Sequence, residues 1–241
     1  MWKNVENLSP FFLKSIGNQY TLDYETTCSR CLKKKLFYCA SCNIITNESL
    51  KNNFQTLKLP LNVLILFSKA EKRKKSTVYF LSALESPQIE IVNFSNPAKA
   101  TIDPETDIVV YMNSTSKCLS ELDISNKKRV VFFDTTWADA KKQTSTIFSG
   151  VQCYHLNNYH TTFWRYNDKS CYDVRFGLST IEALFYFFGE LYINKKLNWE
   201  NADENLKKLI ALYSVQFKLI CESKDVKNAY EVTLKKNNTL N

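Results

Sequence analysis

Four cysteines near the amino-terminal end of the chain have a spacing that can bind a metal ion. They form two pairs, Cys28/Cys31 and Cys39/Cys42, and seven residues separate the pairs. Two such pairs can fold as turns around one tetrahedral ion, and thiolates bind Zn²⁺ strongly without redox chemistry. Four protein ligands leave no open position for a substrate, so we expect a structural zinc site. A redox pair and unrelated cysteines are the alternatives.

Basic and aromatic residues lie between these cysteines. Cations on a rigid loop can contact RNA phosphates, and unstacked bases can stack on aromatic rings. The alternative for the two aromatic residues is that they only pack the loop. The basic residues are Arg30, Lys33, Lys34 and Lys35, and the aromatic residues are Phe37 and Tyr38.

A carboxylate follows a strand-like apolar segment in the middle of the chain, in the run Phe133-Asp134-Thr135-Thr136-Trp137. The carboxyl end of a strand in an α/β protein points toward the crevice in which ligands bind. Asp134 is therefore a candidate for substrate contact or catalysis, and it can also cap a helix that continues through Trp137. Thr136 can bind a cofactor or cap the same helix. Trp137 can stack on a base or belong to the core.

A second polar group opens a helix-like segment. Ser179 and Glu182 have the Ser-x-x-Glu spacing of a capping box, and Leu178 is placed as its hydrophobic staple. This pattern predicts a helix over 179–193, with unpaired N–H groups at its start. Arg165 has no comparable local explanation, and it can bind a carboxylate or an RNA phosphate through two parallel hydrogen bonds.

The elements that would position these residues alternate along the chain. Short, mostly apolar runs predict strands, and the helix-compatible segments between several of them favour an α/β domain with a mostly parallel sheet. A last helix is expected at about 202–221, with an apolar face and with Lys207, Lys208 and Lys218 outside. The predicted strands are 61–67, 89–92, 107–111 and 130–133.

Composition excludes several classes of function. The chain has 241 residues, of which 44% are hydrophobic, and this length and composition are typical of one main globular domain. Only four glycines occur, and neither a P-loop motif nor a dinucleotide-binding motif is present. No apolar run approaches the length of a membrane span and no apolar signal core opens the chain, so we expect a soluble intracellular protein.

The net charge of +8 favours a polyanionic partner, because basic residues that neutralise phosphates release condensed counterions. Together with the motifs above it favours RNA over a merely solvated basic surface.

Several of these segments, in this order, resemble the DTW domain family of tRNA-uridine aminocarboxypropyltransferases, and they are most similar to its eukaryotic branch. The resemblance covers the chain from about Cys28 to Phe188. It is carried by Cys28-Ser29-Arg30-Cys31, Lys75-Ser76-Thr77, Asp134-Thr135-Thr136-Trp137, Phe163-Trp164-Arg165 and Leu178-Ser179-Thr180-Ile181-Glu182-Ala183.

The resemblance implies a SPOUT-like α/β fold whose carboxyl-terminal part forms a trefoil knot around S-adenosylmethionine. It implies that uridine N3 attacks the γ-carbon of the methionine moiety, that the 3-amino-3-carboxypropyl group is transferred, and that 5′-methylthioadenosine leaves. The target it implies is a uridine in the D-loop of tRNA. Since uracil N3 must lose a proton, a positioned base is required, and Asp134 is the candidate.

The resemblance also assigns residues to the two ligands. The start of the 179–193 helix is expected to face the cofactor carboxylate. The cofactor-binding candidates are Asn113, Ser114, Thr136, Trp137, Leu178, Ser179, Thr180 and Glu182. The RNA-binding candidates are Arg30, Lys33, Lys34, Lys35, Lys75 and Arg165.

The expected organisation has four parts: a docking segment at 1–27, a zinc-binding region at 28–58, a catalytic domain at 59–222 and a tail at 223–241. We expect tRNA as partner, a monomer with a dimer as the alternative, and the nucleus with the cytoplasm as the alternative. Two other functions stay open. One is a zinc-containing RNA-binding module without catalysis, and the other is a SPOUT-type RNA methyltransferase.

Overall fold

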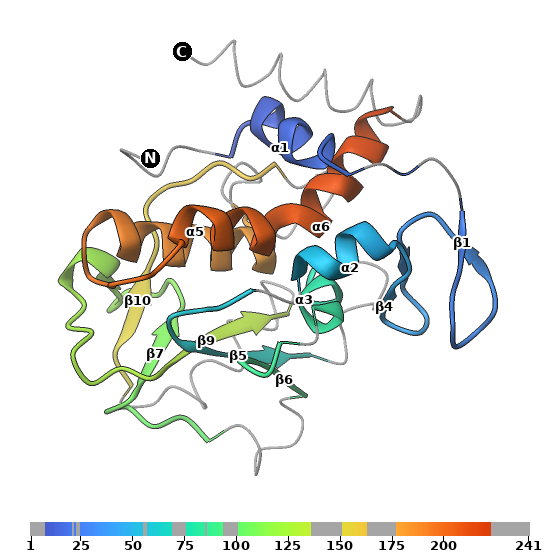
Figure 1. The fold of residues 1–241 in the computed structure, drawn as a ribbon. Helices are drawn as coiled ribbons and strands as arrows, with labels where there is room; N and C mark the ends of the chain where they lie inside the picture. Colours follow the sequence, from blue (N-terminus) through green and yellow to red (C-terminus); the bar gives the residue numbers. More distant parts are fainter. Residues whose placement is uncertain are drawn as a thin grey trace.

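The computed structural model of the chain describes residues 8–20, 22, 25–54, 57–68, 76–84, 86–93, 101–135, 151–162 and 177–222. Its central element is a six-stranded sheet with strand order β6-β5-β9-β7-β10-β8 (Figure 1). Every neighbouring pair in this sheet is parallel, which confirms the predicted α/β class. The strands are β5 (Asn62–Phe67), β6 (Ile89–Asn93), β7 (Asp107–Val110), β8 (Lys117–Cys118), β9 (Arg129–Asp134) and β10 (Cys153–His155).

The sheet has an apolar cluster on each face, because side chains alternate along a strand. On β5, Val63 and Ile65 belong to the main core, whereas Leu64 and Leu66 belong to a smaller cluster with Val131 of β9. Burial on both faces explains why the predicted strands are nearly continuous apolar runs without a polar face.

Helices cover the face with the main core (Figure 1). The two long ones are α5 (Thr180–Ile193) and α6 (Ala202–Glu222), close to the predicted ranges. Phe132 of β9 packs edge-on against Phe187 of α5, with 5.7 Å between ring centroids. The short helices are α2 (Glu48–Phe54) and α3 (Val78–Ala83), and the 3₁₀ turn η2 (Leu119–Glu121) follows β8.

Helix α1 (Pro10–Gly17), which lies in the expected docking segment, runs along α6 (Figure 1). A Cβ atom added at Gly17 would lie 2.8 Å from the carbonyl oxygen of Ser214, so the absence of a side chain permits this close approach. The expectation that Lys208 lies outside the core face is wrong. Its side chain is buried, because α6 is covered on more than one side, and it forms an ion pair with Glu204.

Two small hairpins precede the sheet. The first pairs β1 (Thr26–Thr27) with β2 (Lys34–Lys35), and the second pairs β3 (Tyr38–Cys39) with β4 (Ile44–Ile45).

The expected SPOUT class and trefoil knot stay predictions, because segments 136–150 and 163–176 lie outside the described residues. Within the described part of the chain, none of the helices combines the length and the apolar character needed to cross a membrane.

Candidate functional site

Asp134 ends the central strand β9 and is buried. Its carboxylate accepts two hydrogen bonds from hydroxyl groups, from Ser76 Oγ to Oδ2 at 2.6 Å and from Thr180 Oγ1 to Oδ1 at 2.7 Å. Burial raises the pKa of Asp134, and the two hydroxyl bonds oppose that effect by stabilising the ionised form. Such a carboxylate can accept a proton closer to neutral pH than an exposed aspartate.

Three distant segments meet at this carboxylate because the sheet brings their ends together. Asp134 lies beside Phe67 of β5 in the register, and the Ser68 N–H donates to the Asp134 carbonyl oxygen at 3.0 Å. Farther along the chain from β5, Thr77 Oγ1 accepts the Ile181 N–H of α5 at 3.3 Å. The end of β9, the start of α3 and the start of α5 are thus tied to one another.

Glu182 is fully buried at the first turn of α5, and its carboxylate is surrounded by donors. Ser179 donates its N–H and its hydroxyl to Oε2, each at 2.8 Å, so the predicted return of Glu182 to the helix start is confirmed. Thr161 and Thr162 also donate to it, the latter through both N–H and hydroxyl at 2.7 Å. Glu182 therefore joins the segment that follows β10 to the start of α5.

Some of the backbone N–H groups at the start of α5 already donate hydrogen bonds to side chains of the protein. The Ile181 N–H donates to Thr77 and the Ser179 N–H donates to Glu182, so these two groups already have protein acceptors. Thr180 is buried and donates its hydroxyl to Asp134. Of the expected cofactor-binding residues, Ser179, Thr180 and Glu182 thus make structural contacts in this turn, and Leu178 packs against the main core.

Asn113 and Ser114 are exposed in the turn that follows β7, a neighbour of β9 at the same edge of the sheet. The Asn113 side chain accepts the N–H of Thr115 at 2.9 Å, and its backbone N–H donates to Ser116 Oγ. Ser116 Oγ also lies 3.1 Å from His155 Nδ1 at the end of β10. The turn is therefore internally ordered and joined to the adjacent strand.

Several predicted site residues lie outside the described residues. They are Lys75, Thr136, Trp137 and Arg165, together with the helix expected after Asp134.

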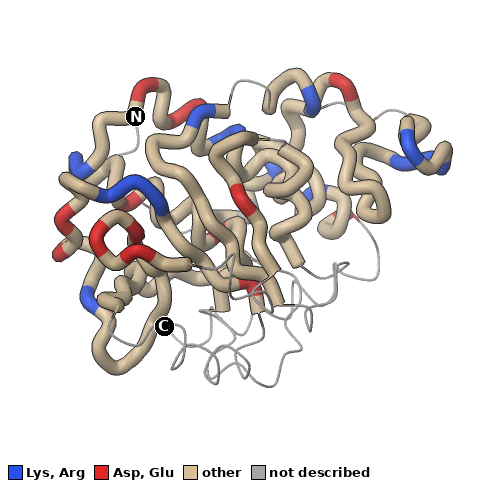
Figure 2. Tube along the Cα trace, turned by 90° about the horizontal axis from the view of Figure 1, so that it is seen from below, with Lys and Arg blue, Asp and Glu red and all other residues tan. Residues whose placement is uncertain are grey.

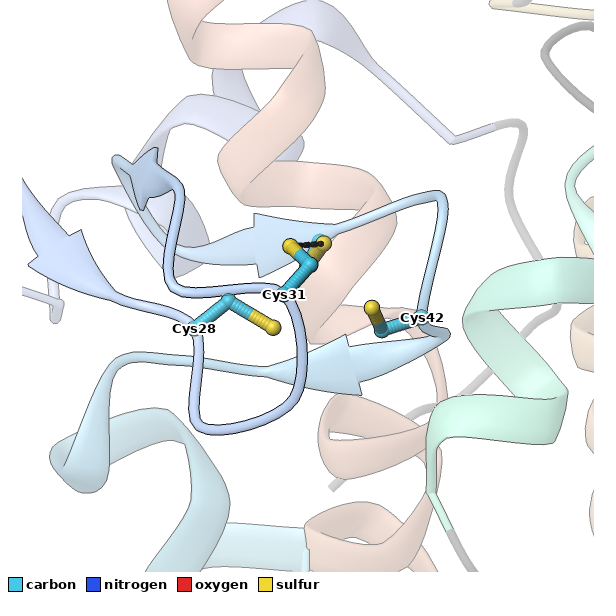
Figure 3. A group of neighbouring side chains, drawn as sticks. Cys28, Cys31 and Cys42 are labelled. Carbon is cyan, nitrogen blue, oxygen red and sulfur yellow. Dashed lines mark hydrogen bonds between the residues drawn. The ribbon is translucent and has the colours of Figure 1, made fainter.

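The four cysteines of the two hairpins converge, as Figure 3 shows for Cys28, Cys31 and Cys42. All four sulfur atoms lie within 4.8 Å of one another, and the Sγ atoms of Cys31 and Cys39 are 3.6 Å apart. Tetrahedral thiolate coordination of zinc, with bonds of about 2.3 Å, separates the sulfur atoms by roughly 3.8 Å. The cluster therefore fits a metal ion such as zinc, and its four ligands complete the coordination.

Each cysteine pair forms the same backbone turn, which we call a knuckle: residues 28–32 form the first knuckle and residues 39–43 the second. In the first, the Leu32 N–H donates to the Cys28 carbonyl at 2.9 Å, and in the second the Asn43 N–H donates to the Cys39 carbonyl at 2.7 Å. Leu32 and Asn43 both have positive φ, 57° and 58°. The Cys31 N–H donates to the Cys28 sulfur and is the largest cause that lowers the pKa of Cys28, to about 6, which favours the thiolate.

The first hairpin, which contains the first knuckle, exposes most of its basic residues. Figure 2 shows Lys and Arg along the first hairpin, at one end of the molecule, and residues 28–47 contain no Asp or Glu. Arg30, Lys33 and Lys34 are exposed, and Lys35 is half-buried.

Phe37 and the half-buried Tyr38 both pack against other parts of the protein, as the packing alternative predicted. Phe37 is buried, and Tyr38 packs edge-on against Phe80 of α3 with 5.4 Å between ring centroids.

Some residues of the site could not be identified from their local pattern. Thr161 and Thr162 carry no motif, and their contact with Glu182 spans about twenty residues of sequence. Ser76 belongs to one of the matching segments, but its bond to Asp134 depends on the pairing of β5 with β9.

Residues 36–221 of the 241-residue chain match the family model described as the DTW domain. The matched residues include the second knuckle, Asp134 and the first turn of α5, whereas Cys28 and Cys31 precede them. No curated protein and no solved structure matches the chain.

Replacing Glu182 with alanine is expected to lower the free energy of unfolding by about 3 kcal/mol, because several buried donors would lose their acceptor. Chemical denaturation measures this loss. Glu200→Ala, at an exposed position, is the matched control and should change stability by less than about 0.5 kcal/mol. Equal effects of the two substitutions would contradict the role given to Glu182.

Purified protein is expected to contain one metal ion per chain, held by the four thiolates, and elemental analysis should identify it as zinc. Cys39→Ser should abolish stoichiometric metal, because it removes a buried ligand. Cys153→Ser, outside the cluster, should leave the metal content unchanged. Full metal content in Cys39→Ser would exclude this site.

Proposed function

The chain belongs to the DTW domain family, and from this premise we propose that it is a tRNA-uridine aminocarboxypropyltransferase. The family is linked to tRNA modification. In the proposed reaction, N3 of a uridine in tRNA receives the 3-amino-3-carboxypropyl group of S-adenosylmethionine. The buried carboxylate of Asp134, held by two hydroxyl donors, is the observation that carries the proposal.

Uracil N3 is protonated at neutral pH, so the nitrogen must lose this proton as its new bond to carbon forms. Asp134 accepts the proton through its carboxylate. Because burial raises its pKa toward neutral pH, Asp134 is a stronger base than an exposed aspartate. S-adenosylmethionine, when bound, supplies an alkyl carbon activated by the sulfonium and a neutral thioether as leaving group. Ser76 and Thr180 hold the Asp134 carboxylate in one orientation throughout.

The residues around Asp134 are the proposed S-adenosylmethionine site. Asn113 and Ser114 contribute from the turn after β7, and Leu178 to Thr180 contribute from the start of α5, with Thr136 and Trp137 following Asp134 in sequence. Glu182 acts indirectly in this proposal. Its carboxylate is occupied by donors of the chain itself, so it positions the first turn of α5.

The metal is proposed to be zinc with a structural role, and the first knuckle together with Lys33 and Lys34 of the first hairpin is proposed to hold tRNA. Arg30, Lys33 and Lys34 present three exposed cations, and residues 28–47 contain no Asp or Glu. Leu32 is 76% exposed at the tip of this knuckle. The positive φ of Leu32 destabilises the fold by about 1 kcal/mol. Strained residues of this kind cluster at functional sites, and the exposed Leu32 side chain is proposed to make an apolar contact with an unstacked base.

The remaining parts of the proposal follow from the resemblance in sequence. They are the eukaryotic branch of the family, a target in the tRNA D-loop, a nuclear location, a monomeric state, and RNA contacts by Lys35, Lys75 and Arg165.

The proposed reaction is tested with two differently labelled samples of S-adenosylmethionine. We expect label in the carboxyl carbon to enter tRNA and label in the methyl group to stay out of it, because the aminocarboxypropyl group is the one transferred. Incorporation of the methyl label would instead identify a methyltransferase. Binding of tRNA without incorporation of either label would identify an RNA-binding module, and both outcomes contradict the proposal.

Asp134→Asn is expected to lower kcat by about a hundredfold or more, because the amide cannot accept the N3 proton. In the unaltered protein, kcat/KM should rise with pH as Asp134 loses its proton, with a midpoint above that of an ordinary aspartate because burial raises the pKa. Asp123→Asn, at an exposed position, is the matched control. A full rate in Asp134→Asn would remove this carboxylate from the mechanism.

A further inference from the structure

The two knuckles share a backbone conformation but differ in their surroundings. Leu32 and Asn43 occupy the same position in their turns, with φ of 57° and 58°. Leu32 is 76% exposed, whereas Asn43 is half-buried and faces α3. Asparagine tolerates this left-handed conformation better than leucine and also brings a donor and an acceptor.

The second knuckle uses these groups to dock on α3. Asn43 Nδ2 donates to Ser82 Oγ, and Asn43 Oδ1 accepts the Tyr38 hydroxyl at 2.6 Å. The same hydroxyl lies 3.3 Å from the Tyr79 carbonyl oxygen, and the Tyr38 ring packs against Phe80. Polar and apolar contacts therefore attach one side of the metal cluster to a helix of only six residues.

The other end of α3 contacts the candidate catalytic carboxylate. Ser76 Oγ donates to Asp134 at 2.6 Å and accepts the Val78 N–H, at the first residue of the helix, at 3.1 Å. Thr77 accepts the N–H of Ile181 in α5. A shift of α3 would thus move the Ser76 donor relative to Asp134.

We propose that the second knuckle positions Asp134 through α3, with Tyr38 and Asn43 as positioning residues. The inference rests on the proposed function and deepens it, because it gives each of the two knuckles that bind the metal its own role. The first knuckle contacts RNA, and the second sets the geometry of the carboxylate that receives the N3 proton. The metal joins the two because each knuckle supplies two of its ligands.

Small displacements at this carboxylate have large effects on rate. A misplacement of about 1 Å in a reacting group can lower a rate by roughly a hundredfold. The contacts at Asn43 lie outside the immediate surroundings of Asp134, so their loss should displace the carboxylate by less than that. A loss of kcat near tenfold is the expected scale.

Asn43→Gly tests the proposal sharply, because glycine keeps the positive φ of the knuckle and removes only the side-chain contacts. Leu32→Gly is the matched substitution in the first knuckle. The measurements are zinc content, tRNA Kd, kcat, and the titration of the Asp134 carboxyl carbon by NMR in the full-length, zinc-loaded protein.

In Asn43→Gly we expect full zinc content and unchanged tRNA Kd, with kcat lowered roughly tenfold and the Asp134 titration midpoint displaced. Leu32→Gly should raise the tRNA Kd and leave the titration midpoint of Asp134 unchanged. Ser82→Ala removes the partner of Asn43 on α3, away from the metal. It should lower kcat and displace the Asp134 titration in the same direction as Asn43→Gly but by less, because the Tyr38 contact of Asn43 remains. The double variant should be no worse than Asn43→Gly alone.

Unchanged kcat and an unchanged Asp134 titration in Ser82→Ala and Asn43→Gly would overturn the proposal. If Asn43→Gly loses zinc, Ser82→Ala alone decides the question. The NMR titration needs neither tRNA nor turnover. Absence of any transfer activity in the unaltered protein would therefore defeat the proposed function, while the link between the second knuckle and Asp134 would still be tested.

Discussion

A carboxylate buried in a protein must be surrounded by hydrogen-bond donors, and in this chain that requirement brings the functional segments together. Glu182 accepts hydrogen bonds from Ser179, Thr161 and Thr162. Asp134 accepts hydrogen bonds from Ser76 and Thr180. The first turn of α5 takes part in both clusters. Without Glu182 these donors would lose the acceptor that ties them to the first turn of α5, and Thr180 in that turn would be held less firmly beside Asp134.

The two buried carboxylates are alike in chemistry but differ in what their surroundings allow. Glu182 accepts five hydrogen bonds from the chain and is fully enclosed, so it serves the fold. Asp134 accepts two from hydroxyl groups and ends a strand at the edge of the sheet where ligands bind in α/β proteins. Glu182 therefore fixes the first turn of α5, and Asp134 is the carboxylate that we propose as the base.

Local patterns in the sequence predicted β5, β6, β7, β9, α5 and α6, because each of these patterns has a local physical cause, whereas the short strands β8 and β10 and the short helices α2 and α3 were not predicted. The apolar run at 61–67 marked a strand buried on both faces, Ser179 and Glu182 marked the start of α5, and the cysteine spacing marked the metal cluster. Contacts between distant segments could not be predicted in this way. The partners Thr161 and Ser76, the docking of Asn43 on α3 and the burial of Lys208 all depend on which elements lie side by side.

In the proposed reaction a uridine in tRNA acquires an aminocarboxypropyl group at N3, and the modified nucleoside itself is the most direct evidence for it. Unmodified tRNA can be incubated with the protein and S-adenosylmethionine, digested to nucleosides and analysed by mass spectrometry. We expect 3-(3-amino-3-carboxypropyl)uridine, together with 5′-methylthioadenosine in equal amount. A methylated uridine with S-adenosylhomocysteine as the second product would contradict it.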